Sequence, residues 1–250
     1  MIDYNIISTG SQGNAVVIEH KILIDCGVSF KALAAEYRTL KLVLLTHIHS
    51  DHFRRATIRR LAAERPRLRW GCGPWLVQPL GELGVSRRQI DALKDGHTYQ
   101  YGSKVVVSPV PLVHDVPNQG YKLRIGWERC IYCTDTANLH GVSAPNYDLY
   151  LIEANYDEAE IAQRIADRKA AGEYAYERRV TRSHLSVQQC DDFIYSNIGA
   201  RGQYVYMHQH EEKEENEREI HERTPCRSEG TQGDQDQQAA GSDAGFYGEA

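Results

Sequence analysis

The chain has 250 residues, of which 41% are hydrophobic, and this is enough for one α/β domain with a sizeable core. No stretch approaches the ~18 apolar residues that a membrane span needs, and the N-terminus lacks the basic and apolar segments of a secretion signal. The six cysteines follow no disulfide spacing, which suits reduced thiols. We therefore expect a soluble cytoplasmic protein that has no membrane partner.

The net charge of −5 is unevenly distributed. From residue 211 to the end there are 12 acidic and 4 basic side chains, which leaves residues 1–210 with a net charge of +3. This mildly basic body is compatible with a polyanionic substrate. We expect residues 1–212 to form the folded domain, and residues 213–250 to be a charged helix and a disordered acidic tail without apolar periodicity.

The first forty residues alternate between apolar runs and turn residues. We predict short strands at residues 4–8, 15–19 and 22–27, with tight turns between them, and then a helix over residues 29–38. The first of these turns, Gly10-Ser11-Gln12-Gly13-Asn14, is rich in glycine and by itself could be an ordinary hairpin.

The densest group of candidate ligands follows the apolar run Leu42-Val43-Leu44-Leu45, which predicts a buried strand. The next residues are Thr46-His47-Ile48-His49-Ser50-Asp51-His52. His47 and His49 are two residues apart, so on an extended chain they point to the same side and can bind one cation. Asp51 and His52 follow where the chain turns, so they face another direction. One loop therefore offers two adjacent metal positions, whose ligands suit zinc better than calcium or magnesium.

This loop resembles the THxHxDH signature of the metallo-β-lactamase superfamily. The turn at residues 10–14 is similar to the GSxGN element of one branch of that superfamily, the WalJ/YycJ-like hydrolases, which are related to ribonuclease Z. Asp25 matches the aspartate in the superfamily's ILID-G strand. We expect Asp25 to orient the metal loop rather than to bind a metal.

A basic helix is predicted over residues 54–64, directly after the metal loop. Its Arg54 and Arg55 could hold phosphates, although a solvated arginine face is the commoner explanation. Residues 74–95 look helical, and residues 97–108 predict a hairpin around Gly102. His114 follows an apolar strand and by itself could be a hydrogen-bonded loop histidine. The run HDVPNQGY that starts there resembles the branch's third motif, and this resemblance implies that His114 is the third ligand of the first metal.

The next strand contains a CxxC pair and ends near an aspartate. Cys130 and Cys133 would point to opposite faces of a strand, so they cannot chelate one ion. Asp135 matches the superfamily's GDT motif, whose aspartate bridges the two metals. Its alternative role is to cap the turn that follows.

The remaining candidates lie at the ends of later elements. Glu153 ends a strand that is similar to the DLLIxE strand of the ribonuclease Z and WalJ-like branches, where it would orient the catalytic histidine. His184 stands in a phrase similar to the branch's GHLS, just before a helix over residues 187–196 with Ser186 as its N-cap. Arg178 and Arg182 beside it would suit a phosphate backbone.

The last predicted strand covers residues 203–208 and ends at a histidine. The family pattern puts the final metal ligand there. His208 and His210 are both able to face the site from this spacing, and we favour His208.

The resemblance covers roughly residues 2–212 and implies an α/β (α+β) fold, a four-layer αββα sandwich with two metal ions at one edge of its sheets. The ions would be zinc, with manganese as the alternative. The implied ligands are His47, His49 and His114 for the first metal, Asp51, His52 and His208 for the second, and Asp135 as the bridge.

The implied activity is hydrolysis by a water that two metals share, with Asp51, Glu153 and His184 taking part in catalysis. We expect a phosphodiesterase or nuclease, with an exonuclease acting on DNA favoured, because the ribonuclease Z arm and the β-CASP insertion are both absent from the sequence. An acyl, thioester or lactone hydrolase would share every metal ligand and remains an alternative. A non-catalytic, metal-stabilised nucleic-acid-binding module is the third hypothesis.

Overall fold

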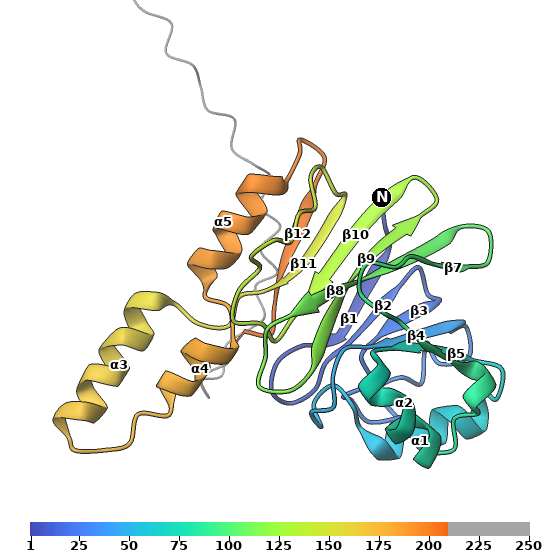
Figure 1. The fold of residues 1–250 in the computed structure, drawn as a ribbon, viewed down its shortest axis with the longest axis horizontal. Coiled ribbons are helices and arrows are strands. Elements are labelled where there is room, and N and C mark those ends of the chain that lie inside the picture. Colours follow the sequence, from blue (N-terminus) through green and yellow to red (C-terminus); the bar gives the residue numbers. More distant parts are fainter. Residues whose placement is uncertain (210–250) are drawn as a thin grey trace, which may run out of the picture.

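The structure is a computed structural model that describes residues 1–209, and its strands form two six-stranded sheets (Figure 1). The predicted tail at residues 213–250 and the alternative ligand His210 lie outside the described residues. The first sheet has its strands in chain order: β1 (Tyr4–Ser8), β2 (Ala15–Ile18), β3 (Ile22–Ile24), β4 (Leu42–Leu45), β5 (Arg69–Cys72) and β6 (Ile90–Ala92). The second sheet has the order β12 (Gln203–Met207), β11 (Leu149–Glu153), β10 (Glu128–Cys133), β9 (Asn118–Ile125), β8 (Val105–Leu112) and β7 (Tyr99–Tyr101).

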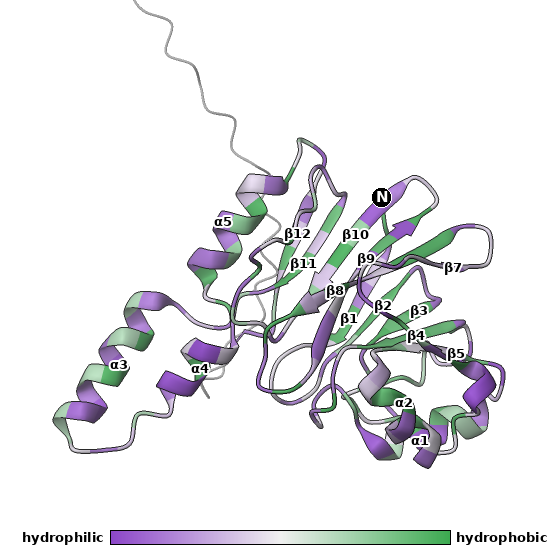
Figure 2. Ribbon diagram, in the orientation of Figure 1, coloured by the Kyte–Doolittle hydropathy of each residue, from purple (hydrophilic) through white to green (hydrophobic). Residues whose placement is uncertain are grey.

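Strand β4 explains why the two sheets stack. Leu42 and Leu44 belong to the apolar cluster that joins the two sheets, whereas Val43 and Leu45 belong to the cluster under the helices of the first sheet. Because both faces of the strand are covered, all four of its residues are apolar and buried. Figure 2 shows the same hydrophobic character along the neighbouring strands β2 and β3.

Helices cover the outer faces of both sheets. On the first sheet they are α1 (Arg55–Glu64), the 3₁₀ helix η1 (Pro74–Leu76) and α2 (Val77–Glu82), and on the second sheet α5 (Val187–Asn197) takes this place (Figure 1). Three buried clusters therefore separate four layers, and the predicted αββα sandwich is confirmed. In residues 1–209 none of the helices has the length and apolar composition that crossing a membrane requires.

Two helix predictions were wrong. Residues 29–38 form consecutive turns, because most of their backbone hydrogen bonds join residues three apart, such as Ala32 N to Ser29 O. The α-helical part of residues 74–95 ends at residue 82, and Gly84 then takes a φ of +90°. A short 3₁₀ helix, η2 (Arg87–Gln89), leads into β6, which pairs in parallel with β5.

Parallel pairing brings the site residues to one edge of each sheet. Strands β3 and β4 are parallel, so Asp25 after β3 lies next to the metal loop after β4. Strands β10, β11 and β12 are also parallel, and their carboxyl ends carry Asp135, Glu153 and His208. Residues far apart in the sequence are thereby placed side by side, as is usual at the carboxyl ends of parallel strands. The CxxC pair is split between the two faces of β10, with Cys130 between the sheets and Cys133 on the outer face.

Candidate metal centre

The metal loop, residues 46–52, is held by a very close backbone contact. The amide of Asn14 donates to the carbonyl of Asp51 at 2.6 Å, and the amide of Gly27 donates to the carbonyl of Asn14 at 2.9 Å. A Cβ at position 27 would lie 1.6 Å from the Asp51 carbonyl oxygen, so only glycine fits there. The Gly-rich turn of residues 10–14 thus supports the loop directly.

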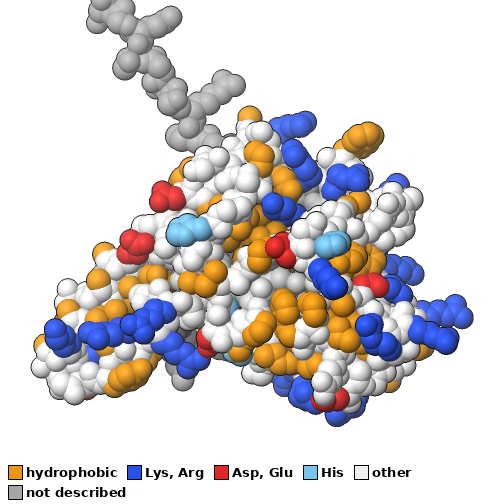
Figure 3. Space-filling model, in the orientation of Figure 1, with side chains coloured by type: hydrophobic (Ala, Val, Ile, Leu, Met, Phe, Trp, Pro, Cys, Tyr) orange, Lys and Arg blue, Asp and Glu red, His pale blue; other side chains and the backbone are white. Residues whose placement is uncertain are grey.

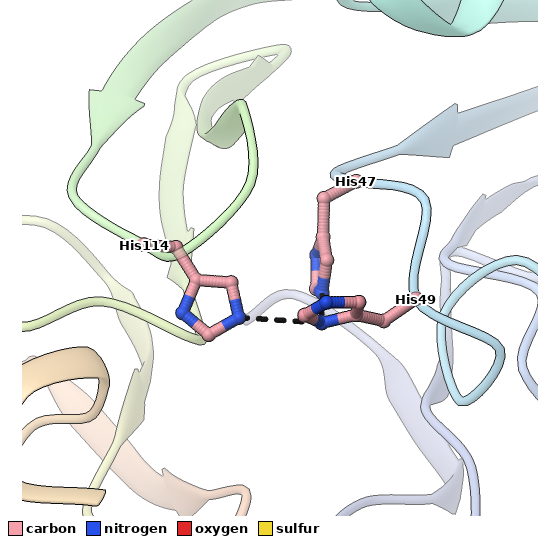
Figure 4. Close-up of side chains that lie close together, drawn as sticks. All are labelled: His47, His49 and His114. Atoms are coloured by element: carbon pink, nitrogen blue, oxygen red, sulfur yellow. Dashed lines mark hydrogen bonds between the residues drawn. The ribbon is translucent and has the colours of Figure 1, made fainter. Parts of the chain in front are cut away.

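Three histidine side chains converge from two elements (Figure 4). Nε2 of His47 lies 3.1 Å from Nδ1 of His49, and Nε2 of His114 lies 3.3 Å from the same Nδ1. Nitrogen ligands at ~2.0 to 2.1 Å from a tetrahedral zinc are about 3.3 Å apart. The spacing of these nitrogens therefore fits one shared cation.

The other ring nitrogens of His47 and His114 already have partners. Nδ1 of His47 is 3.0 Å from the hydroxyl of Thr46, and Nδ1 of His114 donates to the carbonyl of Ser183 at 2.9 Å. Burial lowers the pKa of both imidazoles, which favours their neutral form. Neutral rings with Nδ1–H engaged present Nε2 lone pairs to the same point, which favours a positive ion there.

A second group of ligands adjoins the first. Oδ2 of Asp51 lies 3.6 Å from Nε2 of His52 and 3.7 Å from Nε2 of His208. Asp135 faces both groups, because its Oδ2 is 2.9 Å from Nε2 of His52 and its Oδ1 is 4.0 Å from Nε2 of His114. The structure thus brings together all seven residues that the sequence suggested as ligands.

Nε2 of His208 is buried and has no hydrogen-bond partner, and Oδ2 of Asp135 is buried and makes no well-oriented hydrogen bond although Nε2 of His52 lies 2.9 Å away. An unsatisfied buried polar atom is costly, and a cation bound among these atoms would satisfy both. The donor set of imidazoles and carboxylates is also the one that zinc prefers. The residues present therefore fit a pair of divalent ions.

In the second group, the carboxylates raise the pKa of two histidines, so protons on these imidazoles supply the positive charge that a bound cation would otherwise supply. Burial lowers the pKa of His208, but Asp135, Asp51 and Glu153 raise it more, to about 10. Burial likewise opposes the charge on His52, yet the carboxylates of Asp135 and Asp25 hold its pKa well above the ordinary value. Burial raises the pKa of Asp135, but His52 and His208 hold it well below its usual range.

Two strand ends have a left-handed backbone at the site. Asp135 has φ of 58° and His208 has φ of 52°, a conformation that non-glycine residues adopt rarely and often at functional sites. The side-chain amide of Asn118 stabilises the Asp135 turn by donating to the carbonyls of Thr134 and Asp135 at 3.1 and 2.7 Å. The amide of Asn155 donates to the carbonyl of His208 at 2.8 Å.

Glu153 and His184 form a pair beside the two ligand groups. Nδ1 of His184 lies 2.6 Å from Oε1 of Glu153, and the His184 ring is 5.3 Å from the rings of both His114 and His208. Glu153 is fully buried and also accepts hydrogen bonds from the amides of Thr136 and Leu185, so its position is fixed. His184 keeps 18% of its side chain exposed.

The four arginines predicted to contact phosphate lie in two different places, one pair in a cavity beside the metal loop and the other pair on an exposed helix. Arg54 and Arg55 line a cavity of about 400 Å³ together with Asp51, although Arg55 also pairs with Glu82 at 3.6 Å. Arg178 and Arg182 are exposed on α4 (Glu177–Ser183), and within residues 1–209 neither forms a hydrogen bond or an ion pair with any of the seven candidate ligands.

Sequence reasoning missed Asp115 as a site residue, and with it the ion pair between Asp115 and Arg179. Oδ1 of Asp115 lies 3.4 Å from Nε2 of His49 and 3.2 Å from Nε2 of His114, and Arg179 donates to Oδ2 of Asp115 at 2.6 Å. Asn14 was also missed, and the nitrogen of its side-chain amide, Nδ2, lies 2.8 Å from Nε2 of His52. The only signals in the sequence were that Asp115 follows a candidate ligand and that Asn14 ends the Gly-rich turn.

Comparison with known proteins agrees with this arrangement. The model of the family described as "Beta-lactamase superfamily domain" matches residues 20–209. The chain belongs to this superfamily. Members of the superfamily are generally metal-dependent hydrolases, and the present chain carries the histidine and aspartate cluster that such chemistry needs. No curated protein sequence matches this superfamily member.

Solved structures share the fold at low sequence identity. The metallo-β-lactamase fold protein YhfI from Bacillus subtilis aligns with a TM-score of 0.64 and 15% identity, over 83% of this chain and 86% of YhfI. The short form of human tRNase Z aligns with a TM-score of 0.60 and 16% identity, over 84% of this chain and 92% of that one. A diphosphatase from the PhnP family aligns with a TM-score of 0.59 and 14% identity, over 84% and 87%.

The first prediction from this geometry concerns Gly27. Gly27→Ala should displace the metal loop, because the new methyl group would overlap the Asp51 carbonyl. Elemental analysis should show less bound metal, and thermal unfolding should occur at a lower temperature. Gly81→Ala is the matched control, since nothing lies within 4 Å of its Cβ and alanine is favoured in a helix. Equal metal content in the two variants would contradict the packing argument.

The second prediction concerns protons. Near pH 7, His208 of the metal-free chain carries a proton, because its pKa is raised to about 10, and the pKa of His52 is raised in the same direction, despite burial, by Asp135 and Asp25. Binding of zinc must displace protons from these imidazoles, so apparent affinity should weaken as the pH falls. Calorimetric titration in two buffers of different ionisation enthalpy measures the release. Identical heats in both buffers would show that these imidazoles do not exchange protons for metal.

Proposed function

We propose that the chain is a phosphodiesterase that depends on two divalent metal ions, most suitably zinc, and acts on nucleic acid, with DNA favoured over RNA. The proposal includes the ligand assignment given above for each of the seven residues. It also groups the chain with the WalJ/YycJ-like hydrolases, whose GSxGN turn it shares. The fold that it shares with a tRNase Z and a diphosphatase is consistent with this choice.

The observation that carries the proposal is the position of the Glu153 and His184 pair. His184 lies between the two ligand groups, with its ring 5.3 Å from a histidine of each group. Burial lowers the pKa of His184, but the hydrogen bond and the charge of Glu153 raise it above the ordinary value. The ring therefore keeps its proton to a higher pH than an ordinary histidine, which suits a general acid.

In phosphodiester hydrolysis, different residues of the chain would bind the metal ions, donate a proton and bind the phosphate. Two bound divalent ions would supply Lewis acidity and an activated water. Glu153 accepts a hydrogen bond from Nδ1 of His184 and so fixes the orientation of the ring. The proton on Nε2 would then be transferred to the leaving oxygen as the bond between that oxygen and phosphorus breaks. Arg54 and Arg55, in the cavity beside Asp51, would bind the non-bridging oxygens of the phosphate.

Replacement of His184 tests this role. His184→Ala should lower kcat for bis(p-nitrophenyl) phosphate by ~10² to 10⁴, which is the usual contribution of a general acid, while metal content stays unchanged. His97→Ala, the matched control at an exposed loop histidine, should keep full activity. Glu153→Gln should move the alkaline decline in rate to lower pH, because the carboxylate no longer supports the proton on His184.

Three outcomes would argue against the proposal. If the wild-type chain cleaves thioesters or lactones and leaves bis(p-nitrophenyl) phosphate intact, it is an acyl-transfer hydrolase. If end-labelled single- and double-stranded DNA are both left intact under any divalent metal while they still bind, the chain is a binding module. If His184→Ala keeps full turnover, the acid role is wrong even though the chain is a phosphodiesterase.

A further inference from the structure

Helices α3 (Glu158–Ala170) and α4 form a hairpin that extends from the edge of the sandwich (Figure 1). We call residues 158–183 the arm. Only one residue of α3, Ile161, is buried. The hairpin is held together by Arg168, which pairs with the buried Glu177 at 2.7 Å and covers the ring of Tyr176 at 4.7 Å. The arm therefore offers a large surface that the sandwich does not use.

The acidic side chains of the arm are already engaged, whereas several of its cations are not. Within residues 1–209, the cationic groups of Lys169, Arg178 and Arg182 form neither an ion pair nor a hydrogen bond, and the Thr181 hydroxyl donates only to the backbone carbonyl of Arg178. Figure 3 shows lysine and arginine side chains in a row across the arm. The partners of the acidic residues are Ser186 for Glu158, Arg164 for Glu160, Gln163 for Asp167, and Arg168 for both Glu173 and Glu177.

An exposed aromatic ring precedes these cations. The side chain of Tyr174 is 82% exposed, in the loop between α3 and α4. Arg178 and Arg182 are four residues apart, so they lie on one face of α4, separated by about 6 Å along its axis. Exposed aromatic rings next to a line of positive charge are typical of surfaces that bind unpaired nucleic-acid strands.

The arm ends at the candidate metal centre. The last residue of α4, Ser183, accepts a hydrogen bond from His114 through its carbonyl, and the next residue is His184. Arg182 is thus two residues from the proposed general acid. A nucleic-acid strand bound along α4 would therefore have one of its ends at the metal centre.

From these observations we infer that the arm binds an unpaired nucleic-acid strand and guides it to the metal centre. Arg178 and Arg182 contact its phosphates, and Tyr174 stacks on one of its bases. An unpaired strand is the occupant, because a paired base has both faces covered by its neighbours and cannot stack on Tyr174. The choice of nucleic acid rests on the proposed phosphodiesterase function, but binding can be measured without turnover.

The test uses the full chain and a fluorescent single-stranded oligonucleotide whose phosphorothioate linkages resist hydrolysis. Fluorescence anisotropy at several salt concentrations gives the slope of log affinity against log salt. In the double variant Arg178→Ala with Arg182→Ala, the slope should be less steep by about 1.4, which corresponds to two lost contacts with a single strand. Tyr174→Ala should weaken binding roughly five-fold or more, and Tyr174→Phe should restore it, because the ring is what stacks.

The matched control removes the same charge elsewhere. Arg88 lies in η2 and Arg201 lies before β12, at the opposite end of that strand from His208, and both are exposed. The double variant Arg88→Ala with Arg201→Ala should bind with the wild-type slope. Equal slopes for the two double variants would overturn the inference, and so would equal binding by Tyr174→Ala and Tyr174→Phe.

The failure of this inference and that of the proposed function are distinguishable. Arm-dependent binding without turnover of bis(p-nitrophenyl) phosphate would leave the inference standing and remove the phosphodiesterase. Turnover of that small substrate with identical slopes in the two double variants would keep the phosphodiesterase and remove the role of the arm.

Discussion

The rest of the site depends on the hydrogen bonds that the buried carboxylate of Asp25 accepts. The side chain of Asp25 is inaccessible to solvent and is surrounded by donors from both sheets. It accepts from the amide of Thr46 at 2.9 Å, from Nδ1 of His52 at 2.7 Å and from the hydroxyl of Tyr132 at 3.2 Å. A buried charge is tolerated only when it is compensated in this way, so the requirement fixes the metal loop against β10.

The same end of the sandwich stores backbone strain. Asp25, Asp135 and His208 all have a left-handed backbone one or two residues beyond the end of a strand, at a cost on the order of 1–3 kcal/mol apiece. Buried hydrogen bonds around each residue hold that conformation, as those from Asn118 and Asn155 do. The turn at each strand end directs a side chain inward, where a regular strand would have continued past the site. A preorganised set of ligands is the result.

Much of this organisation could be predicted from the sequence, because its signals are local. The apolar run of β4 followed by the metal loop indicated both the strand and the candidate ligands that the structure brings together. The opposite faces of Cys130 and Cys133 followed from the geometry of a strand. The helix expected at residues 29–38 was wrong, because tertiary contacts there stabilise turns, such as the hydrogen bonds from Arg65 to the carbonyls of Tyr37 and Leu40.

The rest could not be predicted because it depends on contacts between distant segments. Asp115 reaches Arg179 across 64 positions, and no local pattern indicates that pair. Ser183 likewise meets His114 only because α4 ends beside the loop after β8. Such contacts need the fold before they can be seen, and they decide how each ligand is oriented.

The central claim is that seven side chains from separate strand ends bind a pair of metal ions. Elemental analysis of the full chain after zinc loading and exhaustive dialysis tests it most directly. We expect two ions per wild-type chain, and about one in Asp51→Ala, which loses a ligand of the second ion only. A wild-type chain that retains no metal, or an Asp51→Ala variant with the same metal content as wild type, would contradict the account.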